Sequence, residues 1–276
     1  MGLRIWHQSF TVLSKLAPYR AALEAHIANV CRPDTEVVLH GMHPDTYQTE
    51  YPGVDIRYAS LQHLHSVQFI LAGLEAERQG FDAYAICTIP DVSLKESRSL
   101  LNIPAVGYGE AAMLLSCTLG ERFGILNFIP EISEQLEANA RAIGLGSRLA
   151  GVRHVGFTFN DVVAGFNDPA PVIERFQESA RAMIRDGAEV IIPGEAPLCV
   201  LLALNGINRV DEVPIMDGIA AVMKMAELQA DLRVSIGVRP AGGGYYTAKA
   251  PRERVEELVR FYGLEGIVKH FQGAGR

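Results

Sequence analysis

Two polar residues that could do chemistry end two similar stretches of the sequence. GFDAYAICT runs from Gly80 to Thr88, and GAEVIIPGE runs from Gly187 to Glu195, so each polar residue follows its glycine by eight positions. A glutamate in a dry cleft can act as a general base. A threonine hydroxyl can donate a hydrogen bond to a developing oxyanion. The pair therefore predicts proton abstraction, either from carbon or from a water molecule that then attacks a carbonyl group.

Glu195 also has a purely structural interpretation. It directly precedes the apolar run 196–202 and could begin a helix there. An acidic side chain at a helix N-terminus contributes about 0.3–1 kcal/mol of stability through the helix dipole. The dipole would lower the pKa of the carboxyl group, whereas burial would raise it. The residues alone leave both interpretations open.

The elements that must position these residues are short apolar runs alternating with amphipathic segments. Candidate strands, rich in β-branched and aromatic residues, are 4–6, 36–39, 84–87, 123–126, 190–192 and 213–216. Apolar residues recur at helical spacing in 64–74, 132–143 and 173–184. Gly80, Gly144 and Gly187 follow helical segments and are predicted to end them. This alternation predicts an α/β fold with mostly parallel sheets.

A second pair of similar stretches suggests two pseudo-symmetric lobes. IPAVGYGEAAM begins at Ile103 and VPIMDGIAAVM begins at Val213. We expect a first lobe of residues 1–105, completed by 214–276 with a C-terminal extension, and a second lobe of residues 106–213. Ligands of open α/β sheets bind beyond the carboxyl ends of the strands. Thr88 and Glu195 should therefore flank one cleft between the lobes.

Composition and charge exclude several classes of protein. The 276 residues carry a formal net charge of −7, and no basic cluster is present that could bind nucleic acid. No apolar run reaches the roughly 18 residues needed to cross a bilayer, and MGLRIWHQSF does not read as a signal peptide. The four cysteines and eight histidines are scattered without a metal-binding spacing. We expect a reduced, cytoplasmic protein without a metal site.

Three further segments carry predictions of their own. Gly107-Tyr108-Gly109-Glu110 is expected to start a helix of the second lobe rather than to bind phosphate, because no complete nucleotide-binding motif is present. The polar and aromatic segment 40–58 has the composition of a lid or rim. The segment from Pro240 predicts a mobile loop followed by an exposed amphipathic helix, which could cover the cleft or pack on a second subunit of a homo-oligomer.

The region from Gly80 to Phe128, together with GAEVIIPGE and VPIMDGIAAVMKMAE, resembles the aspartate/glutamate/hydantoin racemase superfamily. The resemblance covers most of residues 1–230. It implies two α/β lobes and cofactor-independent proton transfer next to a carboxylate or carbonyl group. In that family two cysteines, one per lobe, face the substrate carbon. Here they correspond to Thr88 and Glu195, and Cys87 lies one residue away from the first position, so a one-residue shift in register would restore a thiol.

The same resemblance implies the other contacts with substrate. His7, Gln8 and Ser9 follow the first strand, where the family has a loop that holds the substrate's carboxylate or carbonyl group, although His7 could equally be a surface histidine. Ile89 follows Thr88, and Ala196 offers its backbone N–H beside Glu195. Phe128 stands where some relatives have a tyrosine. No cofactor is implied.

The leading functional hypothesis is a cofactor-independent isomerase or lyase that acts on a small carboxylate or carbonyl compound, with Glu195 as general base and Thr88 assisting. A hydrolase of an amide, imide or ring carbonyl, in which Glu195 activates water, is the alternative. A non-catalytic protein that binds a small molecule between two lobes is a third hypothesis.

Overall fold

The computed structural model describes residues 2–273. Its strands are β1 (Arg4–Gln8), β2 (Glu36–His40), β3 (Ala83–Ile86), β4 (Ala105–Gly107), β5 (Phe123–Asn127), β6 (Leu149–His154), β7 (Val190–Pro193), β8 (Arg209–Val210) and β9 (Val213–Pro214). Its α-helices are α1 (Ala17–Val30), α2 (Gly53–Ile56), α3 (Ala59–Arg78), α4 (Leu94–Leu100), α5 (Tyr108–Ser116), α6 (Ser133–Ala142), α7 (Phe159–Gly165), α8 (Ala170–Arg185), α9 (Ala196–Leu204), α10 (Gly218–Ile236), α11 (Arg252–Phe261) and α12 (Glu265–Gly273).

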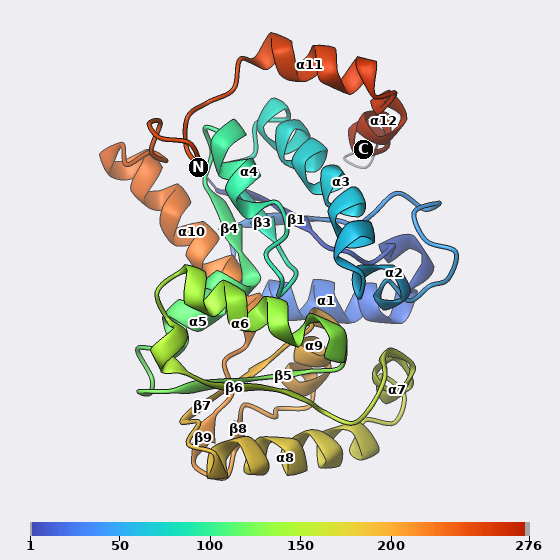
Figure 1. Cartoon of the computed structure of the whole chain (residues 1–276), viewed down its shortest axis with the longest axis vertical. Coiled ribbons are helices and arrows are strands. Elements are labelled where there is room, and N and C mark those ends of the chain that lie inside the picture. Colours follow the sequence, from blue (N-terminus) through green and yellow to red (C-terminus); the bar gives the residue numbers. More distant parts are fainter. Residues whose placement is uncertain (1, 274–276) are drawn as a thin grey trace.

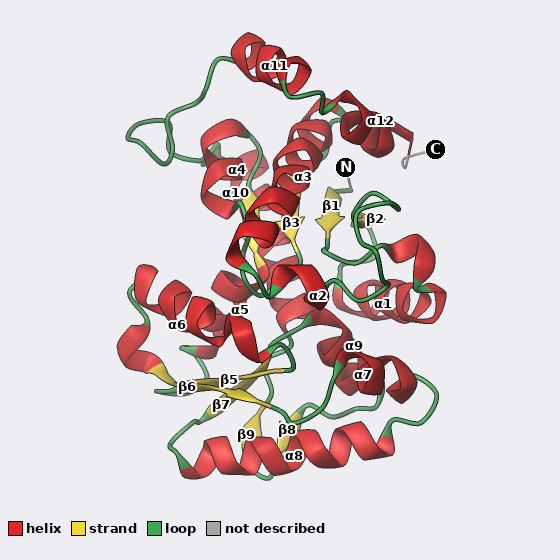
Figure 2. Cartoon of the chain, turned by 45° about the vertical axis from the view of Figure 1, so that its right-hand side comes forward, coloured by secondary structure: helices red, strands yellow, loops and turns green. Residues whose placement is uncertain are grey.

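Two parallel sheets form the centres of two α/β lobes (Figure 1). The first sheet has the order β2-β1-β3-β4, and the second has the order β6-β5-β7. All pairings within these two sheets are parallel, while β8 and β9 form a small antiparallel pair. Helices α1, α5 and α9 lie between the sheets (Figure 2). The predicted α/β class with mostly parallel sheets and two lobes is confirmed.

Most of the predicted elements exist, with small differences at their ends. All six candidate strands overlap observed strands, although β9 stops at Pro214 and Ile215 adds only an isolated parallel bridge to Ile191. The three predicted helix stops are confirmed, because Gly80, Gly144 and Gly187 all have positive φ angles, between 75° and 96°. A glycine adopts this left-handed conformation without the steric cost that a Cβ atom would add.

The C-terminal extension packs on the first lobe, away from the second. Helix α12 lies against α3, and its Phe271 is fully buried with its ring 6.0 Å from that of Trp6. Helix α11 has no buried residue and lies at the far end of the first lobe (Figure 1). The suggestion that this extension covers the cleft is therefore wrong. Within residues 2–273, no helix combines the length and the apolar character needed to cross a bilayer.

Candidate active site

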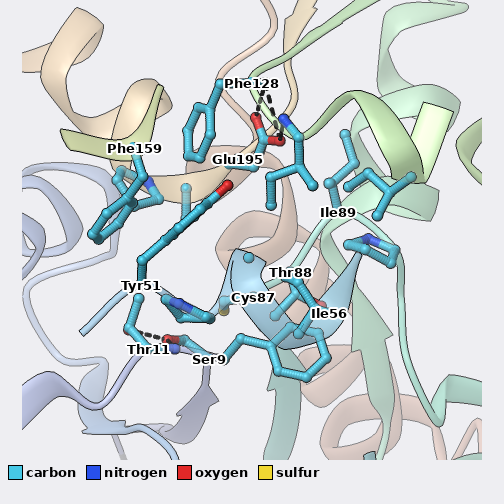
Figure 3. A pocket seen from close by; sticks show the side chains of 18 of the residues that line it. Ser9, Thr11, Tyr51, Ile56, Cys87, Thr88, Ile89, Phe128, Phe159 and Glu195 are labelled. Carbon is cyan, nitrogen blue, oxygen red and sulfur yellow. Dashed lines mark hydrogen bonds between the residues drawn. The ribbon is translucent and has the colours of Figure 1, made fainter. Parts of the chain in front are cut away.

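A mostly apolar cavity lies where the carboxyl ends of the central strands of the two sheets approach each other (Figure 3). It contains about 520 Å³ of empty space when the open solvent at its mouth is counted. Both lobes contribute to its lining, which consists of Ser9, Phe10, Thr11, Tyr19, Tyr51, Pro52, Gly53, Ile56, Cys87, Thr88, Ile89, Pro90, Phe128, Ile129, Ile132, Phe159, Glu195, Ala196 and Pro197.

The carboxyl group of Glu195 is held by the loop that follows β5. Both carboxyl oxygens accept hydrogen bonds from Phe128 N–H at 3.1 Å, and Oε1 also accepts one from Ile129 N–H at 3.2 Å. Gly194 permits this approach, because a Cβ atom there would lie 2.9 Å from Leu126 O and from Asn127 Cβ. Glu195 is the N-cap residue of α9, yet its side chain forms no capping hydrogen bond with that helix. The carboxyl group is thus held against the loop after β5, at the wall of the cavity, rather than on its own helix.

Burial makes Glu195 an unusually weak acid. Loss of solvation raises its pKa from 4.5 to about 8, and the hydrogen bonds from Phe128 and Ile129 offset only part of that rise. Among the described residues that line the cavity there is no lysine, arginine or histidine to stabilise the carboxylate further. A carboxyl group with a pKa near neutrality can gain and lose a proton under ordinary conditions, which general acid–base catalysis requires.

Thr88 lies across the cavity from Glu195, in the turn that follows β3 (Figure 3). Its Oγ1 is buried and has no hydrogen-bond partner within the described chain. A buried hydroxyl without a partner is costly, typically about 1–3 kcal/mol, unless a ligand satisfies it. Thr88 therefore offers an unused donor to whatever the cavity binds.

Cys87 also lines the cavity, but its thiol is turned to the protein backbone. The side chain is 1% exposed, and Sγ donates a weak hydrogen bond to Ala85 O at 3.6 Å. Burial raises the pKa of the thiol well above its ordinary value. A thiol in this environment stays protonated and is a poor base and nucleophile.

The turn after β3 is anchored by Asp91, which has a positive φ of 52°. Its carboxyl oxygens accept hydrogen bonds from Gly109 N–H at 2.8 Å and from Glu110 N–H at 2.6 Å, at the first turn of α5. Tyr108 is indeed the first residue of a helix, as predicted. Because the Asp91 carboxyl group occupies its N-terminal amides, the phosphate-binding alternative for residues 107–110 is wrong.

The residues that the sequence predicted for substrate contact separate into two groups. Ser9, Ile89, Phe128 and Ala196 line the same cavity as Thr88 and Glu195. The Ser9 hydroxyl lies 2.5 Å from that of Thr11, so these two side chains form a polar corner of the lining.

His7 and Gln8 do not line this cavity, and the prediction that they contact substrate there is wrong. Both are fully buried at the end of β1, so His7 is not a surface histidine either. Burial lowers the pKa of His7 to about 4, so the imidazole is neutral. The Gln8 side chain binds Trp6 and the backbone carbonyl of Gly41 and is part of the core. The physical reason is that β1 continues through Gln8, two residues beyond the predicted strand end.

Five aromatic or hydroxyl residues of the lining were not predicted from the sequence: Phe10, Thr11, Tyr19, Tyr51 and Phe159. Tyr51 lies in segment 40–58, whose composition indicated a rim, and that rim does border the cavity through residues 51–53 and Ile56. Tyr19 comes from α1 and Phe159 from α7, and no local sequence pattern distinguishes them from ordinary core aromatics. Within residues 2–273, no group of three His, Cys, Asp or Glu side chains is placed to hold a metal ion.

Comparison with known proteins identifies the family of this chain. The sequence model described as Asp/Glu/Hydantoin racemase matches residues 17–226, well over half of the chain. The chain belongs to the aspartate/glutamate/hydantoin racemase family. Hydantoin racemase of Rhizobium meliloti is 30% identical over 187 residues, which cover 67% of this chain and 70% of that protein.

Two other members give the same result. Hydantoin racemase of Pseudomonas sp. (strain NS671) is 30% identical over 159 residues, which cover 57% of this chain. The match spans 62% of that relative, which is less than two thirds of its length. The crystal structure of allantoin racemase from Pseudomonas fluorescens superposes with a TM-score of 0.70 at 25% identity, over 91% of this chain and 98% of that chain. The resemblance inferred from the sequence is thereby confirmed.

Proposed function

We propose that this protein is a cofactor-independent enzyme that transfers a proton at a carbon atom next to a carbonyl group of a small molecule. The observation that carries the proposal is Glu195, a buried carboxyl group with a pKa near 8 that faces a cavity built from both lobes. Membership of a family with racemase relatives supports chemistry at carbon. The reaction is of the isomerase or lyase type.

Glu195 would act as the general base. Its carboxylate takes the proton, the electrons of the C–H bond pass into an enolate, and negative charge develops on the carbonyl oxygen. The Thr88 hydroxyl can donate a hydrogen bond to that oxygen, because it has no partner within the described chain. The N–H groups of Phe128 and Ile129 hold the carboxyl group of Glu195 in one orientation.

The charge of the cavity favours a substrate that is neutral around the reacting carbon. A free carboxylate there would have no cationic partner among the lining residues and would face Glu195 in its ionised form. Burial of an unpaired charge costs several kcal/mol. A ring carbonyl compound avoids this cost, and its apolar substituent can pack on the aromatic side of the lining. Hydantoins with an apolar 5-substituent are therefore the first probes, in line with the names of two relatives.

Isotope labelling tests this function. Incubated with a single enantiomer of such a hydantoin in D₂O, the enzyme should replace the hydrogen at the reacting carbon with deuterium. A single base returns the proton to the face from which it came, so exchange should outpace conversion to the other enantiomer. ¹H NMR and chiral chromatography measure the two rates on one sample.

The same assay in ¹⁸O-labelled water separates the alternatives. Incorporation of ¹⁸O into a new carboxyl group without exchange at carbon would identify a hydrolase in which Glu195 activates water. Saturable binding of the hydantoin, with neither deuterium nor ¹⁸O incorporated into it, would identify a non-catalytic binding protein. Rapid racemisation would require a second acid–base group on the opposite face of the substrate. It would therefore contradict the assignment of Glu195 as a single base with Thr88 across the cavity from it.

A further inference from the structure

Tyr51 brings a second ionisable side chain into the cavity beside Glu195. It belongs to the rim segment of the first lobe, and Figure 3 shows its ring crossing the cavity with the hydroxyl directed toward Glu195. The charge of Glu195 contributes to the pKa shift of Tyr51, which agrees with their proximity. Neither the proposed proton transfer nor the sequence patterns assign Tyr51 a role.

Two contacts fix the direction of the Tyr51 ring. It stacks on Phe159 of the second lobe, with ring centroids 4.8 Å apart and planes 15° from parallel. The tip of the ring also lies close to Gly53, where a Cβ atom would be 2.1 Å from Tyr51 Cζ and 2.2 Å from Oη. Only a glycine at position 53 leaves room for the hydroxyl end of the ring.

The hydroxyl of Tyr51 is a proton donor under all ordinary conditions. Burial, together with the charge of Glu195, raises its pKa from 10 to about 12. Among the described residues, none forms a hydrogen bond with this hydroxyl. The donor is therefore free for a bound molecule.

We propose that Tyr51 is a further catalytic residue, whose hydroxyl donates a hydrogen bond to the carbonyl oxygen of the bound substrate. The proposal rests on the proposed function of Glu195. When Glu195 takes the proton from carbon, the C–H bond breaks and its electron pair moves into the enolate, which places negative charge on oxygen. Tyr51 stabilises that oxygen with its hydrogen bond and keeps its own proton, and Glu195 returns the proton to carbon. No other reactant is required.

The test is the Tyr51→Phe variant, which preserves the ring and its stacking on Phe159 and removes only the hydroxyl. Loss of one donor to a developing oxyanion typically lowers kcat by about 10²–10³-fold. We expect kcat, and the rate of deuterium uptake from D₂O, to fall by about 100-fold while KM changes by less than about threefold and the melting temperature is preserved. A purely structural role predicts unchanged kcat in the folded variant, and this result would overturn the proposal.

Tyr47→Phe is the matched control. Tyr47 belongs to the same segment and has a buried hydroxyl without a partner within the described chain, but it does not line the cavity. Its variant should keep full activity, and an equal loss in both variants would also overturn the proposal. If Glu195→Gln is inactive while Tyr51→Phe is fully active, only the role of Tyr51 fails. If both variants keep normal activity, the proposed function itself fails.

Discussion

Replacement of Glu195 by glutamine is expected to lower kcat/KM by about 10³-fold, within the 10²–10⁴-fold range typical of a lost general base. The variant should fold, because Oε1 alone accepts hydrogen bonds from both Phe128 and Ile129. The amide oxygen of glutamine can keep both of these bonds. Steady-state kinetics with a substrate that shows exchange in D₂O, combined with a melting curve, measure the effect. Near-normal activity in a folded variant would show that Glu195 is not the base.

The stability of the same variant should depend on pH differently from that of the wild type. Glu195 has a pKa of about 8 in the folded protein and an ordinary one, near 4.5, in the unfolded chain. When folding raises the pKa of a carboxyl group, the protonated group contributes to the free energy of unfolding. This contribution is fully present below the pKa of the unfolded chain and is lost as pH rises through the pKa of the folded protein. Glutamine does not titrate, so Glu195→Gln should melt a few degrees above the wild type at pH 8–9 and at the same temperature near pH 4. A variant less stable than wild type at pH 8 would contradict the claim that folding raises the pKa of Glu195.

Removal of the Thr88 hydroxyl is also expected to have a large effect on activity. Thr88→Val preserves the shape of the side chain and should lower kcat by about 100-fold, because a developing oxyanion loses a preorganised donor. Stability should stay equal or rise slightly, since Oγ1 has no partner within the described chain and its removal relieves an unsatisfied polar group. Thermal melting and kinetics on the same preparation measure both effects.

Cys87→Ser is the control for the Thr88 variant, because the two positions are adjacent and both line the cavity. We expect this variant, and wild-type enzyme treated with a thiol-alkylating reagent, to keep most of the activity. Loss of activity in folded Cys87→Ser, together with unchanged activity in Thr88→Val, would identify the thiol as the acid–base group.

Local sequence signals predicted the framework of the site well. Buried parallel strands produce continuous apolar runs, and positive-φ glycines such as Gly80 and Gly187 mark where helices stop before them. Those two signals were enough to place Thr88 and Glu195 at strand ends in different lobes. The three strands that were missed give weak signals: β4 has three residues, β8 has two, and β6 is an edge strand of intermediate to exposed residues.

Residues that reach the cavity from distant elements could not be predicted. Tyr51 and Phe159 are separated by more than 100 positions, and only the packing of the two lobes brings their rings together. Conversely, Gln8 is a polar residue at a strand end, yet its hydrogen bonds with Trp6 and Gly41 place it in the core. Whether a polar side chain at a strand end points into a cleft depends on where the strand stops, and strand boundaries shift easily by one or two residues.

The pKa of Glu195 itself gives the most direct test of its role as base. A ¹³C NMR titration of the glutamate carboxyl carbons, with Glu195→Gln to assign the resonance, should show a midpoint near pH 8 for Glu195. Since the carboxylate is the active form of a base, kcat/KM should rise with pH below that midpoint and level off above it. A midpoint near 4.5, or a kcat/KM that falls as pH rises through 8, would contradict the assignment of Glu195 as a general base.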